Sequence, residues 1–118
     1  MTTEEIRSVV RKALEDLKAE DVAELDVTDK TSVTDYIIVA SGTSNRHVRA
    51  VANNVVIESK KAGFRPIGVE GETDGEWVLV DLNDIVVHLM LPKTRAFYNL
   101  EKLWDASSAR RSGAASPA

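Results

Sequence analysis

The sequence predicts a single α/β domain whose mixed sheet of about five strands is flanked by helices. Apolar residues recur every three or four positions over residues 3–18 and 45–62, which is the pattern of amphipathic helices. Residues 36–40 form a near-continuous run rich in β-branched side chains, which is typical of a central strand buried on both faces. Two further apolar runs within residues 77–91 flank a short polar turn and form the clearest hairpin. At 118 residues the chain is long enough for one core.

The elements are expected in the order α-β-β-α-β-β-β-α. Thr2 and Glu5 fit a capping box, so the first helix is expected to begin there. An alternating stretch at 23–28 predicts a half-buried strand. Gly42 permits a sharp turn after the buried run, and Gly63 is placed to end the second helix in the left-handed conformation.

The C-terminal part of the chain is expected to complete the sheet and add one helix. A short strand at 67–70 precedes the hairpin, and a helix from about 94 to 104 follows it, with Phe97 on its apolar side. The remaining residues, 105–118, are rich in Ala, Ser, Gly and Arg and are expected to form a disordered tail. Residues 1–104 are therefore expected to be the domain.

Composition and charge narrow the classes of protein. The chain is 43% hydrophobic and 29% charged, and no apolar run is long enough to cross a bilayer. It has no cysteine, which excludes disulfides, a thiol nucleophile and a Cys-based metal site. The acidic, helix-like N-terminus is unlike a targeting peptide, so a cytoplasmic protein is expected. The net charge of −4 argues against a general nucleic-acid binder and favours a basic partner, although local patches can oppose the net charge.

The turn Ser41-Gly42-Thr43-Ser44 is the first candidate for a chemical site. It joins a strand to a helix, where free backbone N–H groups can hold an anion. Nucleotidyltransferases have such a turn and follow it about ten residues later with paired acids that bind the catalytic metal. Residues 53–57 contain no carboxylate here, so nothing in that segment could hold Mg²⁺ against a triphosphate. A structural turn with a helix cap at Thr43 or Ser44 is favoured, and a nucleotide-binding or transferase function remains the alternative.

The two histidines make a weak case for acid–base or metal chemistry. His47 lies beside Arg46 and Arg49, where a solvated basic corner is the simplest interpretation. Asp84 is explained as a residue of the hairpin turn. Neither histidine has the spacing of a metal motif, so no metal and no cofactor are expected.

The hairpin at 77–90 is predicted to have two unlike surfaces, because side chains alternate along a strand. Pairing about Asn83-Asp84 sets Asp81 opposite Val86 and Trp77 opposite Met90. One surface is purely aliphatic and belongs in the core: Val78, Val80, Leu82, Ile85, Val87 and Leu89. The other surface is mixed: Trp77, Leu79, Asp81, Val86, His88 and Met90. That surface either packs under a helix, with His88 finding a buried partner, or is a solvent-accessible binding face; the Trp and the Met favour the binding face.

Four segments, in one order, carry a resemblance to a known family. Residues 35–48 read DYIIVASGTSNRHV, residues 68–71 read GVEG, residues 77–88 read WVLVDLNDIVVH, and residues 95–104 read RAFYNLEKLW. With these segments the chain resembles the Iojap family of ribosomal silencing factors over nearly the whole expected domain.

The resemblance implies a small α/β fold related to nucleotidyltransferases and no enzymatic activity. It further implies binding to protein fourteen of the large ribosomal subunit, on the face that meets the small subunit. Occupying that surface would block subunit joining and lower translation when nutrients are short, through an interface of ordinary size, about 800 Å² on each partner. A homodimer of the free chain is also implied. The hypothesis that the mixed hairpin surface makes this contact rests on its shared face and not on the family.

Overall fold

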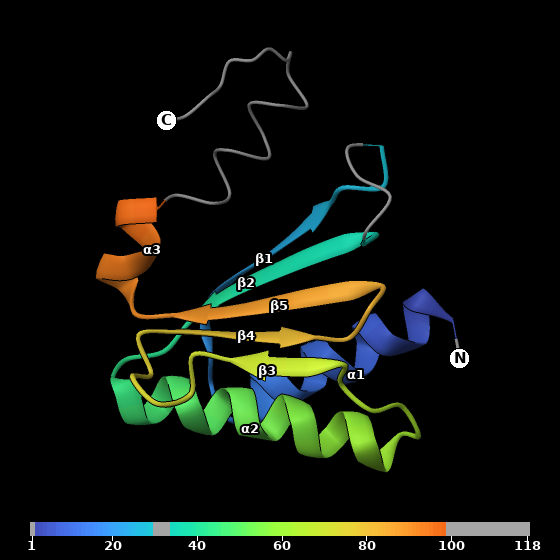
Figure 1. Ribbon diagram of the computed structural model, residues 1–118, viewed down its shortest axis with the longest axis horizontal. Coiled ribbons are helices and arrows are strands. Elements are labelled where there is room, and N and C mark those ends of the chain that lie inside the picture. The colour runs from blue at the N-terminus through green and yellow to red at the C-terminus, as the bar shows by residue number, and fades with distance from the viewer. Residues whose placement is uncertain (1, 30–33, 99–118) are drawn as a thin grey trace.

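The computed structural model describes residues 2–29 and 34–98, and its helices and strands follow the predicted order (Figure 1). In chain order they are α1 (Thr3–Asp16), β1 (Glu20–Asp26), β2 (Tyr36–Ser41), α2 (Asn45–Lys61), β3 (Gly68–Glu70), β4 (Trp77–Asp81), β5 (Ile85–Met90) and α3 (Pro92–Tyr98). The predicted capping box is present at α1, because the Glu5 N–H donates to the Thr2 hydroxyl at 3.1 Å and the Thr2 N–H donates to the Glu5 carboxylate at 2.8 Å. Gly63 follows α2 with φ of 101°, as expected of a left-handed helix end.

The five strands form one mixed sheet in the order β1-β2-β5-β4-β3, which confirms the predicted fold class. β2 and β5 are the central strands and run parallel, and the other neighbours are antiparallel. α1 and α2 pack against each other and against one face of this sheet (Figure 1). α3 follows directly from the end of β5, on the side of the sheet away from α2. No helix in the described part of the chain is long and apolar enough to cross a membrane.

The face of the sheet that meets α1 and α2, here called the helix-covered face, contains most of the core. The hairpin contributes the six aliphatic residues predicted for it, each at most 5% exposed: Val78, Val80, Leu82, Ile85, Val87 and Leu89. Ile38 and Ala40 of β2 join them, and Val48, Val51 and Val55 of α2 pack from the opposite side. Burying one such side chain contributes roughly 1.5–3 kcal/mol, so this layer is the main source of stability.

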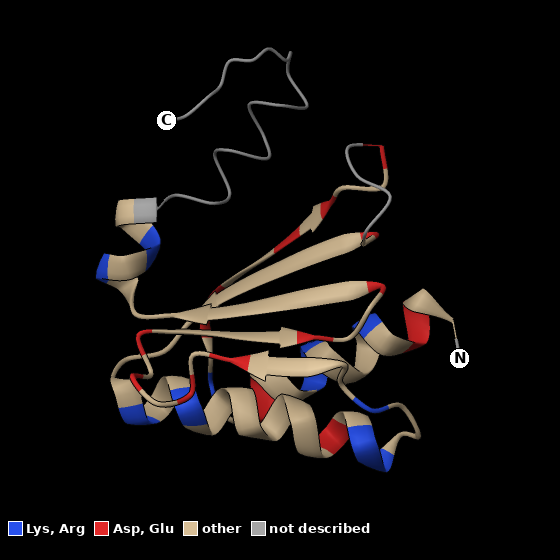
Figure 2. Cartoon of the chain, viewed as in Figure 1, with Lys and Arg blue, Asp and Glu red and all other residues tan. Residues whose placement is uncertain are grey.

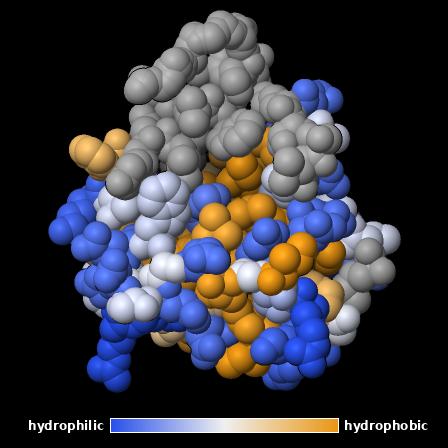
Figure 3. Space-filling view, viewed as in Figure 1, coloured by the Kyte–Doolittle hydropathy of each residue, from blue (hydrophilic) through white to orange (hydrophobic). Residues whose placement is uncertain are grey.

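The opposite face of the sheet, here called the second face, is formed by alternate residues of the three middle strands. They are Ile37, Val39 and Ser41 of β2, Val86, His88 and Met90 of β5, and Trp77, Leu79 and Asp81 of β4. In Figure 3 hydrophobic residues gather in the middle of the visible side of the molecule, where the strands lie, with hydrophilic residues around them. The second face therefore combines apolar side chains with three polar ones.

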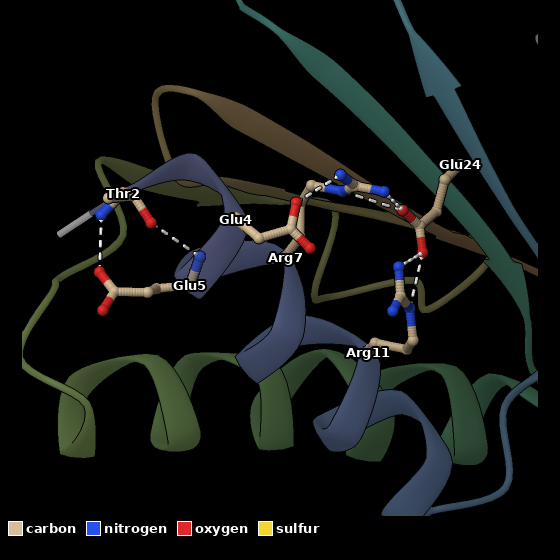
Figure 4. A network of polar contacts seen from close by, with 6 residues as sticks. All are labelled: Thr2, Glu4, Glu5, Arg7, Arg11 and Glu24. Carbon is tan, nitrogen blue, oxygen red and sulfur yellow. Dashed lines mark hydrogen bonds and ion pairs between the residues drawn. The ribbon is translucent and has the colours of Figure 1, made fainter.

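Ion pairs connect α1 to the edge strand β1 of the sheet (Figure 4). The Glu24 carboxylate of β1 accepts from Arg7 at 2.7 Å and from Arg11 at 2.5 Å. The Arg7 guanidinium also lies 4.3 Å from the centre of the Tyr36 ring, a cation–π contact. Burial raises the pKa of Glu24, but the hydrogen bonds and charges of the two arginines lower it by more, so the net shift is downward. The carboxylate is thus held in its charged form.

Two boundaries differ from prediction. β1 covers Glu20–Asp26 and not 23–28, because its polar first residues pair with β2 across an irregularity in which Asp21 has φ of 50°. α3 begins at Pro92, two residues early, because proline is favoured in the first turn of a helix. The predicted helix beyond Tyr98 and the predicted disordered tail at 105–118 lie outside the described residues.

Candidate partner-binding face

The structure places all six residues of the predicted mixed hairpin surface on the second face, in the predicted register. β4 and β5 pair Trp77 with Met90, Leu79 with His88, and Asp81 with Val86. β2 extends each row by one residue, since Ser41 pairs with Met90, Val39 with His88, and Ile37 with Val86. The face is therefore a three-strand surface, wider than the hairpin that predicted it.

Trp77 and His88 are joined by a hydrogen bond across the hairpin. The Trp77 Nε1–H donates to His88 Nδ1 at 2.9 Å, and the ring centroids are 5.9 Å apart with the planes at 46°. An accepting Nδ1 requires a free lone pair, so the histidine is neutral and carries its proton on Nε2. Burial lowers the pKa of His88 from 6.5 to about 4, which keeps it neutral at physiological pH. The neutral histidine therefore orients the Trp77 indole through the hydrogen bond and adds no positive charge to the second face.

The expectation that the whole surface is solvent-accessible is wrong for two residues. Met90 is 0% exposed and His88 is 9% exposed, whereas Trp77, Leu79, Asp81 and Val86 are half-buried. The difference follows from position, because β5 is a central strand with a neighbour on each side and its C-terminal half lies between β2 and Trp77. The buried partner that the alternative interpretation expected for His88 is Trp77.

Acidic side chains surround the accessible part of the face. Asp81 is itself acidic, and its carboxylate accepts from the Asn83 N–H at 2.8 Å. Glu70 pairs in register with Leu79, and exposed Glu76 directly precedes Trp77. Figure 2 shows these acidic positions along β3, β4 and the loops that flank them. A basic partner is therefore electrostatically favoured here.

α3 adds residues beside the face that the sequence did not single out as functional. The Arg95 guanidinium donates to the Ser41 hydroxyl at 2.9 Å, which ties α3 to β2. Glu76, Lys93, Thr94 and Phe97 line an open pocket of about 400 Å³ next to the Trp77 end of β4. Phe97 was predicted on the apolar side of its helix but is 81% exposed. A large aromatic residue at helical spacing predicts burial, and only the structure places it at the surface.

The Ser41–Ser44 turn has few free donors for an anion. The Thr43 N–H donates to His47 Nδ1 at 2.9 Å, and the Gly42 N–H donates to the Met90 carbonyl at 3.0 Å. The Ser44 hydroxyl caps α2 by accepting from the His47 N–H at 3.0 Å, as predicted. A Cβ on Gly42 would lie 2.7 Å from a Val48 methyl, so this glycine allows close packing.

His47 lies in an exposed basic corner, as expected, and both of its ring nitrogens also bind backbone groups. Nδ1 accepts from the Thr43 N–H, and Nε2 lies 2.7 Å from the Leu17 carbonyl at the end of α1, to which it therefore donates. Asn54, in the segment where a transferase would have its acids, donates to the Ala13 carbonyl at 2.9 Å. Both side chains hold α1 and α2 together. Across residues 2–29 and 34–98, no group of three acidic or histidine side chains is placed to hold a metal.

Comparison with known proteins identifies the family. The model of the family described as "Ribosomal silencing factor during starvation" (RsfS) matches residues 1–117. The chain belongs to this family. It is 49% identical over 104 residues to the ribosomal silencing factor RsfS of Chromobacterium violaceum, which covers 88% of this chain and 85% of the relative. It is 36% identical to RsfS of Bacillus subtilis, with 88% of each chain covered.

More distant members and solved structures agree with this assignment. The mouse protein named "Mitochondrial assembly of ribosomal large subunit protein 1" is 39% identical over 93 residues, which are 76% of this chain and 41% of that protein. The crystal structure of a protein from Chromobacterium violaceum matches with a TM-score of 0.87 and 44% identity, over 99% of this chain and 95% of that one. A crystal structure from Bacillus halodurans matches with a TM-score of 0.79 and 34% identity, over 86% of this chain and 95% of that one. The family's name describes a regulatory, ribosome-associated role.

Proposed function

We propose that this chain binds the large ribosomal subunit through its protein fourteen, on the surface that meets the small subunit, and so prevents the two subunits from joining. The observation that carries the proposal is the match of residues 1–117 to a family of ribosomal silencing factors. The name of the mouse relative, which refers to the ribosomal large subunit, supports that subunit as the partner. Steric occlusion needs no reaction, and it needs only an interface of ordinary size, about 800 Å² on each side.

The second face is the proposed contact. Trp77, Leu79, Asp81 and Val86 are accessible to a partner, while His88 and Met90 lie beneath them as support. A tryptophan held rigidly by a hydrogen bond is well suited to be an interface anchor, because little side-chain freedom is lost on binding. The acidic residues around the face suit a basic ribosomal protein.

The contact is tested by adding positive charge to the face. Leu79→Lys and Val86→Lys each oppose a basic partner, and each new lysine has a carboxylate as cross-strand neighbour, Glu70 or Asp81. Both variants are expected to lose at least tenfold in co-sedimentation with purified large subunits. Leu17→Lys is the matched control, because Leu17 is 37% exposed at the end of α1, away from the face. Urea unfolding of all three checks the fold, and retained binding by folded Leu79→Lys and Val86→Lys would refute the contact.

The partner and the mechanism need separate measurements. Isolated protein fourteen is expected to bind the wild-type chain and not the folded Leu79→Lys variant. Light scattering of mixed subunits is expected to show less joining when the large subunits are first saturated with the wild-type chain. Joining at the normal rate and extent on saturated large subunits would contradict occlusion even if binding is confirmed.

The free chain is also proposed to pair with a second copy through the same face. A two-fold dimer buries the same patch on both copies, and the exposed Phe97, which lines a pocket with Glu76, offers further apolar area for it. Light scattering coupled to size exclusion is expected to show a dimer that Leu79→Lys converts to a monomer. A dimer that is unaffected by this change would place the self-contact elsewhere.

A further inference from the structure

The outward side of α2 concentrates positive charge in an acidic protein. Residues 36–69 contain five Lys or Arg and one Asp or Glu, although the whole chain has 15 basic and 19 acidic residues. Four of the five cations belong to α2: Arg46, Arg49, Lys60 and Lys61. Figure 2 shows them as two groups, one at each end of the helix. The charge on this side of the molecule is thus opposite to the net charge.

The two basic ends face the same direction and are separated by uncharged positions. Arg46 and Lys60 are fourteen residues apart, which is close to four helical turns, so they lie on one side at a separation of about 21 Å. Between Arg49, which belongs to the first basic end, and Lys60 the exposed positions are Ala50, Asn53 and Ile57. Neither Arg46 nor Lys60 makes an ion pair with any residue in the described part of the chain. Both cations are therefore available to an external anion.

We propose that the outward side of α2 binds an RNA duplex by lying across its minor groove, with Arg46 and Lys60 on the phosphates of the two opposite strands. A-form RNA has a wide, shallow minor groove edged by phosphates and lined with 2′-hydroxyls. A helix with cations at both ends and the short side chains of Ala50 and Asn53 near its middle has the matching shape. Asn53, at the middle, has the amide donor and acceptor that a 2′-hydroxyl can use. Recognition is of shape and backbone, without base sequence.

Other features of the surface define the proposal further. α2 lies on the opposite side of the sheet from the second face, so RNA and a protein partner can be bound at once, and the inference does not depend on the proposed function. The acidic loop 71–76 contacts the first turn of α2 through the Asp74 carbonyl, which accepts from Asn45 at 2.8 Å. Its carboxylates weaken phosphate binding at that end, so Lys60 is expected to contribute more than Arg46. Ile57 is the one large apolar side chain exposed on α2, too little for insertion into a membrane surface.

The test measures binding of the full-length protein to a 20-base-pair RNA duplex by fluorescence anisotropy, from low to moderate salt. Arg46→Glu combined with Lys60→Glu is expected to weaken binding at low salt at least tenfold and to reduce the slope of log affinity against log salt by about 2, for two lost phosphate contacts. Lys18→Glu combined with Lys93→Glu changes the net charge equally at exposed positions outside α2 and is expected to have a much smaller effect. Circular dichroism confirms that both variants fold.

A DNA duplex of the same sequence and anionic lipid vesicles complete the design. Both are expected to bind more weakly than RNA, because the B-form minor groove is only about 6 Å wide and the outward side of α2 is not apolar. The proposal is overturned if wild-type protein does not bind the RNA at low salt, or if the two double variants lose affinity equally, which would mean that net charge alone decides. Equal or tighter binding to DNA or vesicles would also overturn it.

Discussion

The two faces of the sheet are built from the same strands, yet they differ in composition and in burial. On the helix-covered face the hairpin residues are purely aliphatic and at most 5% exposed. The second face alternates with it residue by residue but mixes Trp, His and Asp with aliphatic side chains, and four of its hairpin residues are half-buried. A face that only has to be stable needs no polar atoms, whereas a face that has to recognise a partner needs some. The contrast supports a division between stability and the proposed partner binding within one hairpin.

The largest expected effect on stability comes from replacing a leucine with alanine, and the same change on each face compares the two faces. Leu89→Ala on the helix-covered face is expected to cost about 3 kcal/mol of unfolding free energy, because Leu89 is fully buried and leaves a cavity. Leu79→Ala on the second face is expected to cost about 1 kcal/mol, since Leu79 is half-buried and water can enter. Urea unfolding measures both. Equal losses would mean that the second face is as much a part of the core as the first.

An effect of comparable size is expected at acid pH, through the protonation of His88. The folded-state pKa of His88 is about 4 and its ordinary value is 6.5, so between these values the unfolded chain binds a proton that the folded chain does not. The contribution of neutral His88 to the unfolding free energy should therefore be fully present above pH 6.5. The unfolding free energy should fall by about 3 kcal/mol as the pH is lowered to 4.

The contribution of His88 is isolated by a variant that keeps its hydrogen bond. In His88→Gln the amide oxygen can still accept from the Trp77 indole, but the side chain does not titrate. Urea unfolding from pH 7 to 4 is expected to show a shallower loss in this variant than in the wild type, the difference being the histidine. If the wild type and the variant lose the same stability, water reaches His88 in the folded protein, and the second face is more accessible to solvent than the structure indicates.

An intermediate effect is expected where α1 is fastened to the sheet edge. Glu24→Gln weakens the ion pairs to Arg7 and Arg11 together and is expected to cost about 1–2 kcal/mol, because this carboxylate is only 19% exposed. Asp16→Asn removes the exposed pair to Lys12 and is expected to cost less than about 0.5 kcal/mol. Urea unfolding at low and high salt compares them. Equal losses of unfolding free energy in the two variants would show that the ion pairs of Glu24 stabilise the protein no more than an ordinary surface ion pair.

Much of the fold was predictable because it rests on local patterns. The element order and the pairing of Trp77 with Met90 and of Asp81 with Val86 were both predicted, since a two-residue turn fixes the register of a hairpin. The depth of Met90 was not, because alternation tells which face a side chain is on and not what surrounds it. Likewise, the contact of His47 with the Leu17 carbonyl joins residues thirty positions apart, and no local pattern reports it.

The smallest expected effect is also the sharpest comparison, because it uses two adjacent residues of β5. Val86 is half-buried on the second face and Val87 is 0% exposed on the helix-covered face. Threonine has nearly the same shape as valine but adds a hydroxyl that must find a hydrogen bond. Val86→Thr is therefore expected to change the unfolding free energy by less than about 0.5 kcal/mol, since water can reach the hydroxyl, whereas Val87→Thr should cost about 1–3 kcal/mol. A measurable loss in urea unfolding for Val86→Thr would show that this position is closed to solvent, and Val86 would then be an unsuitable contact for any partner.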